Sequence, residues 1–434
     1  LVARGMAYPC FCSDEELARD RELALSQGRP PVYAGRWATA DRGEVAEKLE
    51  RGEPHVVRFR VGAERAVDIR DAVRGAVRWR TEAVGDFVIL RSSGLPVYNF
   101  SAVVDDALMG ISHVLRGEEH LSNTLRQELL YQALGFAPPR WAHLPLILGA
   151  DRAKLSKRAG AASLADWRAQ GMLPSALRNH LALLGWNDGT ERELFLDSLE
   201  LARAFSLERV SKAPAIFDPA KLRWINGQHL AGMPRTELES LIVRRWMENG
   251  LLCEAWEGEQ PGANQQGQEP PAPRSPILSP FHLQAVHLVR KGLDLLPEAD
   301  DALLGALGYP LEQTLAALEA DGHAREPLVE KGAFLPVAQA VVDGLADEQA
   351  PLSQAIHQGS YKAWTQELGK KLGRKGKALF LPLRLALTGC LQGPEVAEIL
   401  KLLALESGEI RDRSCLATLA QRRQRLKAWV DARL

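Results

Sequence analysis

Apolar and polar residues alternate with a period close to two between residues 54 and 100. The apolar runs read HVVRFRV, AVRWR and DFVILR, and Gly, Asp and Glu residues separate them. Alternation of this kind is typical of half-buried strands. It predicts an antiparallel β region, preceded by a helix over residues 14–25 that Ser13 would cap.

The pattern changes after Tyr98. Short apolar runs at 111–115 and 143–148 predict buried strands, and the amphipathic segment at 123–134 between them has helical spacing. A strand, a helix and a strand in this order predict a βαβ unit, and therefore a parallel sheet.

Almost every segment from residue 163 onward has the helical period, as Leu173, Leu177 and Leu181 illustrate. Residues 257–276 contain almost no apolar side chains, which predicts a disordered insertion. The last third resumes amphipathic helices and carries one dense basic run, KKLGRKGK, at 370–377. The pattern therefore predicts an α/β region followed by an all-α region.

Chain length, hydropathy, net charge and cysteine content limit the classes of function that are possible. A chain of 434 residues is long enough for about two to four domains. No apolar stretch reaches the ~18 residues that a bilayer span needs, which excludes an integral membrane protein. The net charge of −1 means that local basic patches would have to hold any nucleic acid. Five cysteines without framework spacing indicate a reducing compartment.

Two charged segments follow the predicted parallel strands. RGEEH, at 116–120, follows the first strand, and KLSKR, at 154–158, follows the second. Ligands of open α/β sheets bind beyond the carboxyl ends of such strands. A cationic loop there can stabilise charge on transferring phosphate oxygens. The alternative is a solvated charged loop, but the position beside the Glu/His cluster favours the phosphate role.

KLSKR resembles the Lys-Met-Ser-Lys-Ser signature of class I aminoacyl-tRNA synthetases, in the form used by bacterial-type glutamyl-tRNA synthetases. The upstream segment GLPVYNFSAVVDDALMGISHVLRGEEHLSNTLRQELLYQALG is similar to that family, as are SLADWRAQGMLPSALRNHLALLGW and IFDPAKLRWING downstream. Their order and spacing match the family, most strongly over residues 85–230. The resemblance implies the second half of a Rossmann-type α/β catalytic domain with an inserted α+β acceptor-binding domain, then all-α stem-contact and anticodon-binding domains.

The resemblance also implies domain limits. The expected domains are an acceptor-binding insertion (1–97), the second catalytic half (98–160), a helical stem-contact domain (161–232) and a helical anticodon-binding domain (233–434) that contains the insertion.

The implied activity is that of a glutamate–tRNA ligase. Glutamate would react with ATP to give glutamyl-adenylate, and tRNA(Glu) would then accept the glutamyl group. Mg²⁺ would accompany ATP as part of the substrate complex. Whether tRNA(Gln) is also charged stays open, and we expect a monomer that does not associate with membranes. The alternative is a non-catalytic tRNA-binding paralogue.

The resemblance assigns roles to single residues. Arg116 and Tyr98 match the positions that hold glutamate, and Ala102 lines the same pocket. A guanidinium can pair bidentately with a carboxylate. The positions that match the ATP site are Glu119, His120, Ile147, Lys154 and Lys157. Lys154 and Lys157 would be the catalytic cations, and Lys157 would stabilise the transition state.

Two of these roles have simpler alternatives. Tyr98 could pack in the core beside Pro96. The segment at 118–120, Glu-Glu-His, could ligate a metal, although a third partner is missing.

The basic run near the C-terminus resembles the family's anticodon-binding portion through KKLGRKGKALFLPLRLALTG. A basic run on an apolar helix suits phosphate contact, and a solvated turn is the alternative. The expected tRNA-binding residues are Lys371, Arg374, Lys375 and Lys377.

Cys10 and Cys12 resemble the start of a zinc knuckle that some relatives carry. Their pattern continues with a tyrosine and a further cysteine. Here Tyr33 is present, but Trp37 stands at the cysteine position. Tryptophan cannot ligate zinc, and two thiolates do not complete a tetrahedral site. We therefore expect no zinc and structural cysteines.

The family's second signature, His-Ile-Gly-His, does not occur in this sequence. We therefore expect that the chain begins inside the acceptor-binding insertion, and that a polypeptide of this extent does not catalyse efficiently. The basic stretch followed by LQGPEV at 391–396 resembles cyanobacterial and plant organellar members of the family, and the Gln/Pro-rich insertion suggests a nuclear-encoded version. Together they imply a plastid or mitochondrial location, with the cytoplasm as the alternative.

Overall fold

The structure, a computed structural model, describes residues 1–434 except 34, 63–64, 156–162, 254–277, 321–333 and 411–414. The insertion predicted at 257–276 lies outside the described residues. Two compact units are present, residues 1–161 with 178–219 and residues 162–177 with 220–434. Within the described residues, no helix combines the length and hydropathy that a bilayer span requires.

The strands are β1 (Ala7–Cys10), β2 (Val56–Phe59), β3 (Ala66–Asp71), β4 (Gly75–Arg80), β5 (Phe87–Leu90), β6 (His113–Gly117), β7 (Arg140–Leu144), β8 (Ile147–Leu148) and β9 (Ala215–Ile216). The first helices are α1 (Asp14–Ser26), α2 (Arg42–Glu50), α3 (Tyr98–Leu108), α4 (Leu121–Leu134), α5 (Leu164–Ala169), α6 (Pro174–Leu183), α7 (Ser198–Ala204), α8 (Pro219–Gly232) and α9 (Arg235–Glu248). The remaining helices are α10 (Pro280–Val289), α11 (Glu298–Leu307), α12 (Leu311–Ala320), α13 (Phe334–Gly344), α14 (Pro351–His357), α15 (Tyr361–Leu372), α16 (Lys377–Thr388), α17 (Val396–Ala404) and α18 (Leu419–Asp431).

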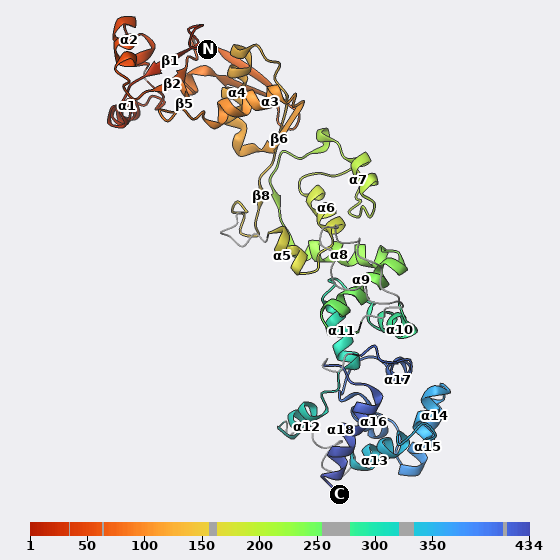
Figure 1. Cartoon of the computed structure of the whole chain (residues 1–434). Coiled ribbons are helices and arrows are strands. Elements are labelled where there is room, and N and C mark those ends of the chain that lie inside the picture. Colours follow the sequence, from red (N-terminus) through yellow and green to blue (C-terminus); the bar gives the residue numbers. More distant parts are fainter. Residues whose placement is uncertain (34, 63–64, 156–162, 254–277, 321–333, 411–414) are drawn as a thin grey trace, which may run out of the picture. The chain divides into compact units, whose positions relative to one another are not determined.

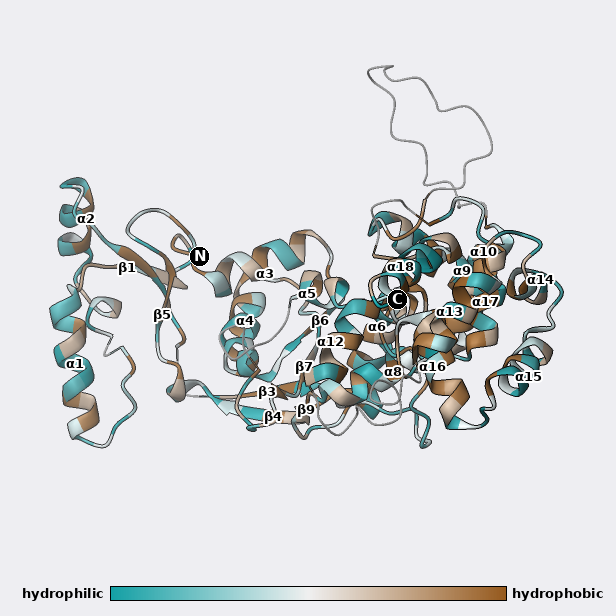
Figure 2. Cartoon of the chain, turned by 90° about the horizontal axis from the view of Figure 1, so that it is seen from below, coloured by the Kyte–Doolittle hydropathy of each residue, from teal (hydrophilic) through white to brown (hydrophobic). Residues whose placement is uncertain are grey.

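The first sheet, in the order β1-β2-β5, is antiparallel as predicted. The helix α1 follows β1 and is coloured mostly teal, for hydrophilic residues, in Figure 2. The Ser13 side chain accepts from the Glu16 amide, and the Glu16 carboxylate accepts from the Ser13 amide. This reciprocal cap satisfies two amides that the helix leaves unpaired, and it confirms the predicted start of the helix.

The second sheet has the order β4-β3-β7-β6. The strands β6 and β7 run parallel and α4 connects them, which confirms the predicted βαβ unit. The antiparallel hairpin β3-β4 joins the same sheet through a parallel pairing of β3 with β7. A strand that precedes residue 97, β3, therefore pairs with a strand that follows residue 97, β7. The domain boundary expected at residue 97 stays a prediction.

The predicted strand at 143–148 was wrong in its limits. The parallel strand β7 ends at Leu144, because Pro145 has no amide hydrogen to donate to a ladder. Residues 147–148 form the separate strand β8, which pairs in parallel with β9.

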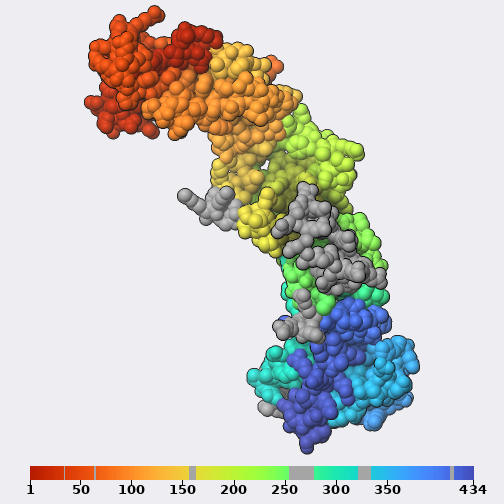
Figure 3. All heavy atoms as spheres, viewed as in Figure 1, coloured from red at the N-terminus to blue at the C-terminus, as the bar shows by residue number. Residues whose placement is uncertain are grey.

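Helices α3 and α4 pack against each other and cover the β6–β7 region (Figure 1). The buried face of α4 presents Leu125, Leu129 and Tyr131 to Ile69 and Trp141 on the sheet. The atoms of these elements form a continuous mass in Figure 3. This packing fixes α4, and with it the side chains that α4 directs toward the end of β6.

Among the described residues of the second unit, the named secondary-structure elements are all helices. Its core is formed mainly by α13, α16 and α18, whose apolar residues include Val341, Leu383 and Leu426. Together the two units give the mixed α/β and then helical order that the sequence pattern predicts.

Arg422 on α18 is a buried cation, with only 2% of its surface exposed. Its guanidinium donates to the carbonyl oxygens of Ala417 at 3.0 Å, Leu387 at 2.8 Å and Leu307 at 2.7 Å. It also lies 5.5 Å from the ring centre of Tyr309. Burial lowers the pKa of Arg422 to about 10. The charge is thus compensated by backbone carbonyls from three separate segments.

Candidate functional site

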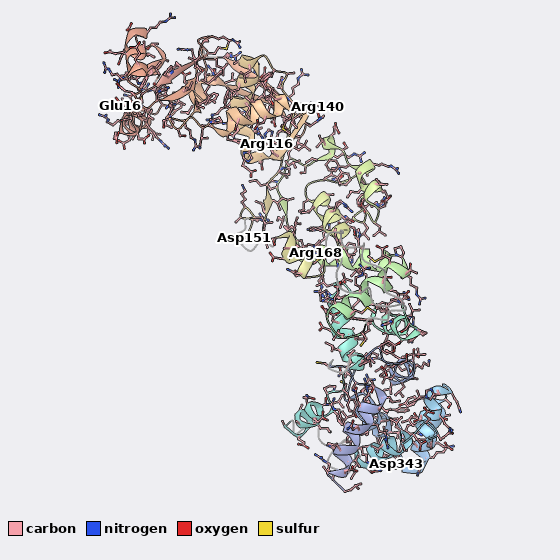
Figure 4. The ribbon with its side chains drawn as sticks, in the orientation of Figure 1. Glu16, Arg116, Arg140, Asp151, Arg168 and Asp343 are labelled. Atoms are coloured by element: carbon pink, nitrogen blue, oxygen red, sulfur yellow. The ribbon has the colours of Figure 1, made fainter. Side chains whose placement is uncertain are left out.

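Arg116 lies near the end of β6, directly opposite His143 on β7 (Figure 4 labels Arg116). Its Nε donates to His143 Nε2 at 3.1 Å. Its Nη2 donates to Thr124 Oγ1 at 2.7 Å and to Gln127 Oε1 at 2.8 Å on α4. A longer contact joins Nη2 to the His120 carbonyl at 3.4 Å. None of these bonds uses Nη1, so the guanidinium is held along one edge.

Tyr98 begins α3 and is 54% exposed, so the alternative of a core-packed aromatic is wrong. Its phenol interacts with the Arg116 guanidinium: burial lowers the pKa of Arg116, and the Tyr98 interaction opposes that shift. The Tyr98 ring centre lies 6.3 Å from that of His120. Ala102 follows one turn later on α3 and is half-buried. The structure therefore brings Tyr98, Arg116 and His120 together.

The two glutamates that follow β6 bind residues from other segments of the same unit. Glu118 pairs with Arg74 and accepts from the Leu146 amide at 3.2 Å. Glu119 accepts from Lys154 Nζ at 2.7 Å, and this ammonium group lowers the pKa of Glu119. Lys154, predicted from the basic loop, therefore lies beside the Glu/His cluster, as the order of the strands suggested.

The segment between β8 and Lys154 is a tight turn. The Gly149 amide donates to the Ala153 carbonyl at 2.9 Å, and the Leu155 amide donates to the Ile147 carbonyl at 3.0 Å. Asp151, labelled in Figure 4, accepts from the Ala153 amide at 3.0 Å. This turn returns the chain beside β8, where Ile147 is half-buried. Lys157 lies outside the described residues.

The sequence did not reveal the residues behind Arg116. Asp71 at the end of β3 accepts from His143 Nδ1 at 2.6 Å, and both side chains are completely buried. Thr124 and Gln127 on α4 complete the group. The available signal was His143 itself, an isolated histidine in the strand RWAHL between the apolar residues Ala142 and Leu144.

At Asp71, hydrogen bonding lowers the pKa by more than burial raises it. Burial alone would raise its pKa, but donors from the Arg74 amide, the His143 ring and the Val73 amide keep the pKa of Asp71 below its ordinary value. Burial lowers the pKa of His143, and Asp71 offsets only part of that shift. The group therefore holds an ionised carboxylate and a neutral imidazole.

The lowered pKa of His143 predicts that the free energy of unfolding depends on pH. The unfolded chain binds a proton at this histidine below about pH 6.5, and the folded protein binds it only at lower pH, so the free energy of unfolding should fall as the pH drops through about 6.5, by up to ~1.4 kcal/mol per pH unit. His282, which burial shifts in the same direction, adds to the loss. Urea unfolding at about pH 7.5 and about pH 5.5 measures it. His143→Gln should show a weaker pH dependence, and an unchanged dependence would contradict the assignment.

The second unit contains a cleft of about 1060 Å³ between α15, α16 and α17. Of the predicted tRNA-binding residues, Arg374 and Lys375 line it, whereas Lys371 and Lys377 lie outside its lining. The other cations of its lining are Lys362, Lys370, Arg384 and Lys401. Phe380, 57% exposed, adds an aromatic face. A basic cleft with an exposed aromatic ring suits single-stranded nucleic acid.

Cys10 and Cys12 both contact the Tyr33 hydroxyl, at 3.5 Å and 3.7 Å. The Trp37 amide donates to the same oxygen at 3.0 Å, and the Trp37 ring packs with Cys10 and Tyr33 in a small core. Among the residues that the structure describes, no group of three His, Cys, Asp or Glu side chains could share a metal ion.

Comparison with known proteins gives a consistent result. The family model "tRNA synthetases class I (E and Q), catalytic domain" matches residues 1–224, and an anticodon binding domain matches residues 326–411. The glutamate–tRNA ligase of Carboxydothermus hydrogenoformans is 38% identical over 413 residues, covering 95% of this chain and 79% of that protein. That of Heliobacterium modesticaldum is 38% identical over 414 residues, covering 95% of this chain and 77% of that protein.

Among solved structures, a glutamate tRNA ligase from Elizabethkingia meningosepticum, in complex with its amino acid, superposes with a TM-score of 0.72. It is 24% identical and aligns over 98% of this chain and 79% of that one. This likeness supports the fold. The predicted fold class, an α/β catalytic portion followed by a helical anticodon-binding portion, is confirmed.

Proposed function

The chain belongs to the glutamate–tRNA ligases, which are class I tRNA synthetases, and from that premise we propose that Arg116 and Tyr98 bind the glutamate substrate. The enzyme uses ATP to join glutamate to tRNA(Glu). The observation that carries the assignment is the fixed guanidinium of Arg116, which interacts with the exposed phenol of Tyr98. A preorganised cation and a hydroxyl together suit one carboxylate.

The geometry changes the expectation that Arg116 pairs bidentately with the carboxylate. Bidentate pairing would need two free nitrogens on one edge of the guanidinium, but Nε and Nη2 already donate to protein groups. We therefore propose that a carboxylate is bound through Nη1 of Arg116 and the Tyr98 hydroxyl.

In the proposed first step, a carboxylate oxygen of glutamate attacks the α-phosphorus of ATP, and the bond to pyrophosphate breaks. The terminal adenosine hydroxyl of the tRNA then attacks the activated carbonyl and releases AMP. Lys154 and Lys157 would neutralise the phosphate oxygens as charge develops on them. Glu119, His120 and Ile147 would border the nucleotide, with Mg²⁺ bound mainly to phosphates and water. The ion pair of Lys154 with Glu119 would hold that ammonium ready until ATP enters.

Pyrophosphate exchange on the complete natural enzyme tests this assignment. Exchange that requires both glutamate and tRNA is expected. Tight tRNA binding without exchange would instead support a tRNA-binding protein that does not catalyse.

We also propose that the basic cleft of the second unit contacts the anticodon arm, with Arg374 and Lys375 among the contacts. Lys377 begins α16, where the helix dipole disfavours a cation, so helix stability does not account for its charge. Lys371 lies in the last turn of α15, where the dipole favours a cation. Lys377 is therefore the stronger candidate of the two for contact with phosphate.

The variant Arg374→Glu/Lys375→Glu should bind tRNA(Glu) more than tenfold more weakly, and the salt dependence of its affinity should decrease by about one unit of log–log slope per lost contact. Lys427→Glu on α18 is the control for added negative charge, because Lys427 is exposed and does not line the cleft. Filter binding across a salt series measures both. Equal losses in the two variants would rule out a specific role for the cleft.

Three narrower questions remain. We propose a monomer, which light scattering tests. Aminoacylation of the two purified tRNAs tests whether tRNA(Gln) is charged as well as tRNA(Glu). We propose a plastid or mitochondrial location on the basis of the Gln/Pro-rich segment at 257–276, and organelle fractionation tests it.

A further inference from the structure

Asp71 and His143 form a pair with no exposed side-chain surface directly behind Arg116. Three backbone amides hold the Asp71 carboxylate in place. Its Oδ1 accepts from the amides of Val73 at 2.9 Å, Arg74 at 2.7 Å and His143 at 3.2 Å. Its Oδ2 is thereby directed at the imidazole, where it lies 2.6 Å from Nδ1.

The tautomer of His143 follows from its other partner. Arginine nitrogens donate and do not accept. Because Arg116 Nε lies 3.1 Å from His143 Nε2, that ring nitrogen must be the unprotonated acceptor. The ring proton is therefore on Nδ1, where it is donated to Asp71. A doubly protonated ring would set a hydrogen of His143 against a hydrogen of Arg116.

The orientation of the guanidinium is determined by this chain of bonds. Asp71 sets the tautomer, His143 accepts from Nε, and Thr124 and Gln127 accept from Nη2. The guanidinium carbon also lies 5.3 Å from the ring centre of Trp141. Rotation of the group would break several bonds at once. We propose that Asp71 and His143 are positioning residues, which hold Arg116 so that Nη1 faces the substrate carboxylate; this inference rests on the proposed role of Arg116.

Packing alone does not explain the pair. A buried carboxylate and imidazole must recover a large desolvation cost, and apolar side chains of similar volume would avoid it. The surrounding core, which includes Leu125, Leu129 and Trp141, is apolar and could accommodate such side chains. What apolar residues could not supply is a lone pair directed at Arg116 Nε.

The decisive variant in the complete natural enzyme is Asp71→Asn. The asparagine oxygen can keep the backbone bonds, but its amide would donate to Nδ1 and move the ring proton to Nε2. His143 would then direct a donor at Arg116. The KM for glutamate should rise at least tenfold, and the KM for ATP should stay within about threefold of the wild-type value.

Two substitutions at His143 refine the test. His143→Leu removes the acceptor and should raise the KM for glutamate as Asp71→Asn does. His143→Gln offers Oε1 to Arg116 and should recover part of the loss. The matched control is Leu125→Ala on α4, between Thr124 and Gln127, which should lower the melting temperature and leave the KM for glutamate unchanged.

The outcomes separate this inference from the proposed function. If Arg116→Gln raises the KM for glutamate and Asp71→Asn does not, the positioning role is wrong and the substrate role of Arg116 stands. If neither variant changes the KM for glutamate, both the positioning role of Asp71 and the substrate role of Arg116 are wrong. If Leu125→Ala raises the KM as much as Asp71→Asn, general loosening of the core is the cause, and the inference is again wrong.

A measurement on the wild-type enzyme covers the case in which Asp71→Asn does not fold. Nitrogen NMR of labelled histidine rings, with His143→Gln identifying the signal, should show the Nδ1-protonated tautomer unchanged between about pH 5.5 and about pH 8. An Nε2-protonated ring or an imidazolium in that range would overturn the proposal.

Discussion

Arg116→Gln should raise the KM for glutamate by about 30- to 1000-fold, the equivalent of ~2–4 kcal/mol for removing one partner of a desolvated, hydrogen-bonded charge pair. The structure gives two reasons for an effect this large. The guanidinium is held by His143, Thr124 and Gln127, so its orientation is set before the substrate arrives. Glutamine cannot supply the charge, and it cannot reach these acceptors and the substrate together.

The control for this prediction is Arg78→Gln. Arg78 lies on β4 of the same sheet, is exposed, and pairs only with exposed Asp68 among its described partners. Ion pairs this exposed are screened by water and contribute little, so the kinetics should not change. Steady-state aminoacylation with glutamate varied measures both variants. A KM that stays within threefold in Arg116→Gln would remove Arg116 from the glutamate site.

Lys157→Ala should slow formation of glutamyl-adenylate by about 10²- to 10³-fold, as expected for loss of a charge that stabilises the transition state. The affinity for tRNA should hardly change, because the role proposed for Lys157 is toward the ATP phosphates and not toward the tRNA. Lys154→Ala should have a smaller effect, since Glu119 neutralises that ammonium before ATP binds.

Single-turnover formation of adenylate measures these rates in the presence of saturating tRNA. Lys212→Ala is the matched control, because Lys212 is an exposed lysine of the same unit. A Lys157→Ala enzyme with the wild-type rate would exclude this lysine from catalysis. A loss of tRNA affinity equal to the loss of rate would show instead that the substitution disturbs the whole site.

The sequence predicted the elements whose determinants are local. The cap at Ser13 and the helix α4 follow from neighbouring residues, and the order of β6, α4 and β7 follows from the hydrophobic pattern. The division at Pro145 needed knowledge of which strand pairs with which, because both sides of the proline are apolar. The place of β3 was equally hidden, since its partner β7 begins about 70 residues later.

The candidate site shows the same limit. Arg116, Glu119 and Lys154 follow predicted strands, and the structure places them as neighbours or as a linked pair. Asp71 and His143 are 72 residues apart, and no motif in the sequence links them. A buried bond between distant residues leaves no local pattern, so only the folded chain reveals it.

The buried guanidinium of Arg422 has a consequence for synthesis on the ribosome. Its acceptors come from Leu307, Leu387 and Ala417, whereas the cation arrives with the last helix, α18. Until α18 has been synthesised, those carbonyls lack the guanidinium that they bind in the folded protein, and α13 and α16, which pack against each other, lack the third helix of their core. The part of the core around Arg422 is therefore complete only when α18 is present. We expect a chain that stops before α18 to form the other helix pairs and to leave this part of the core open.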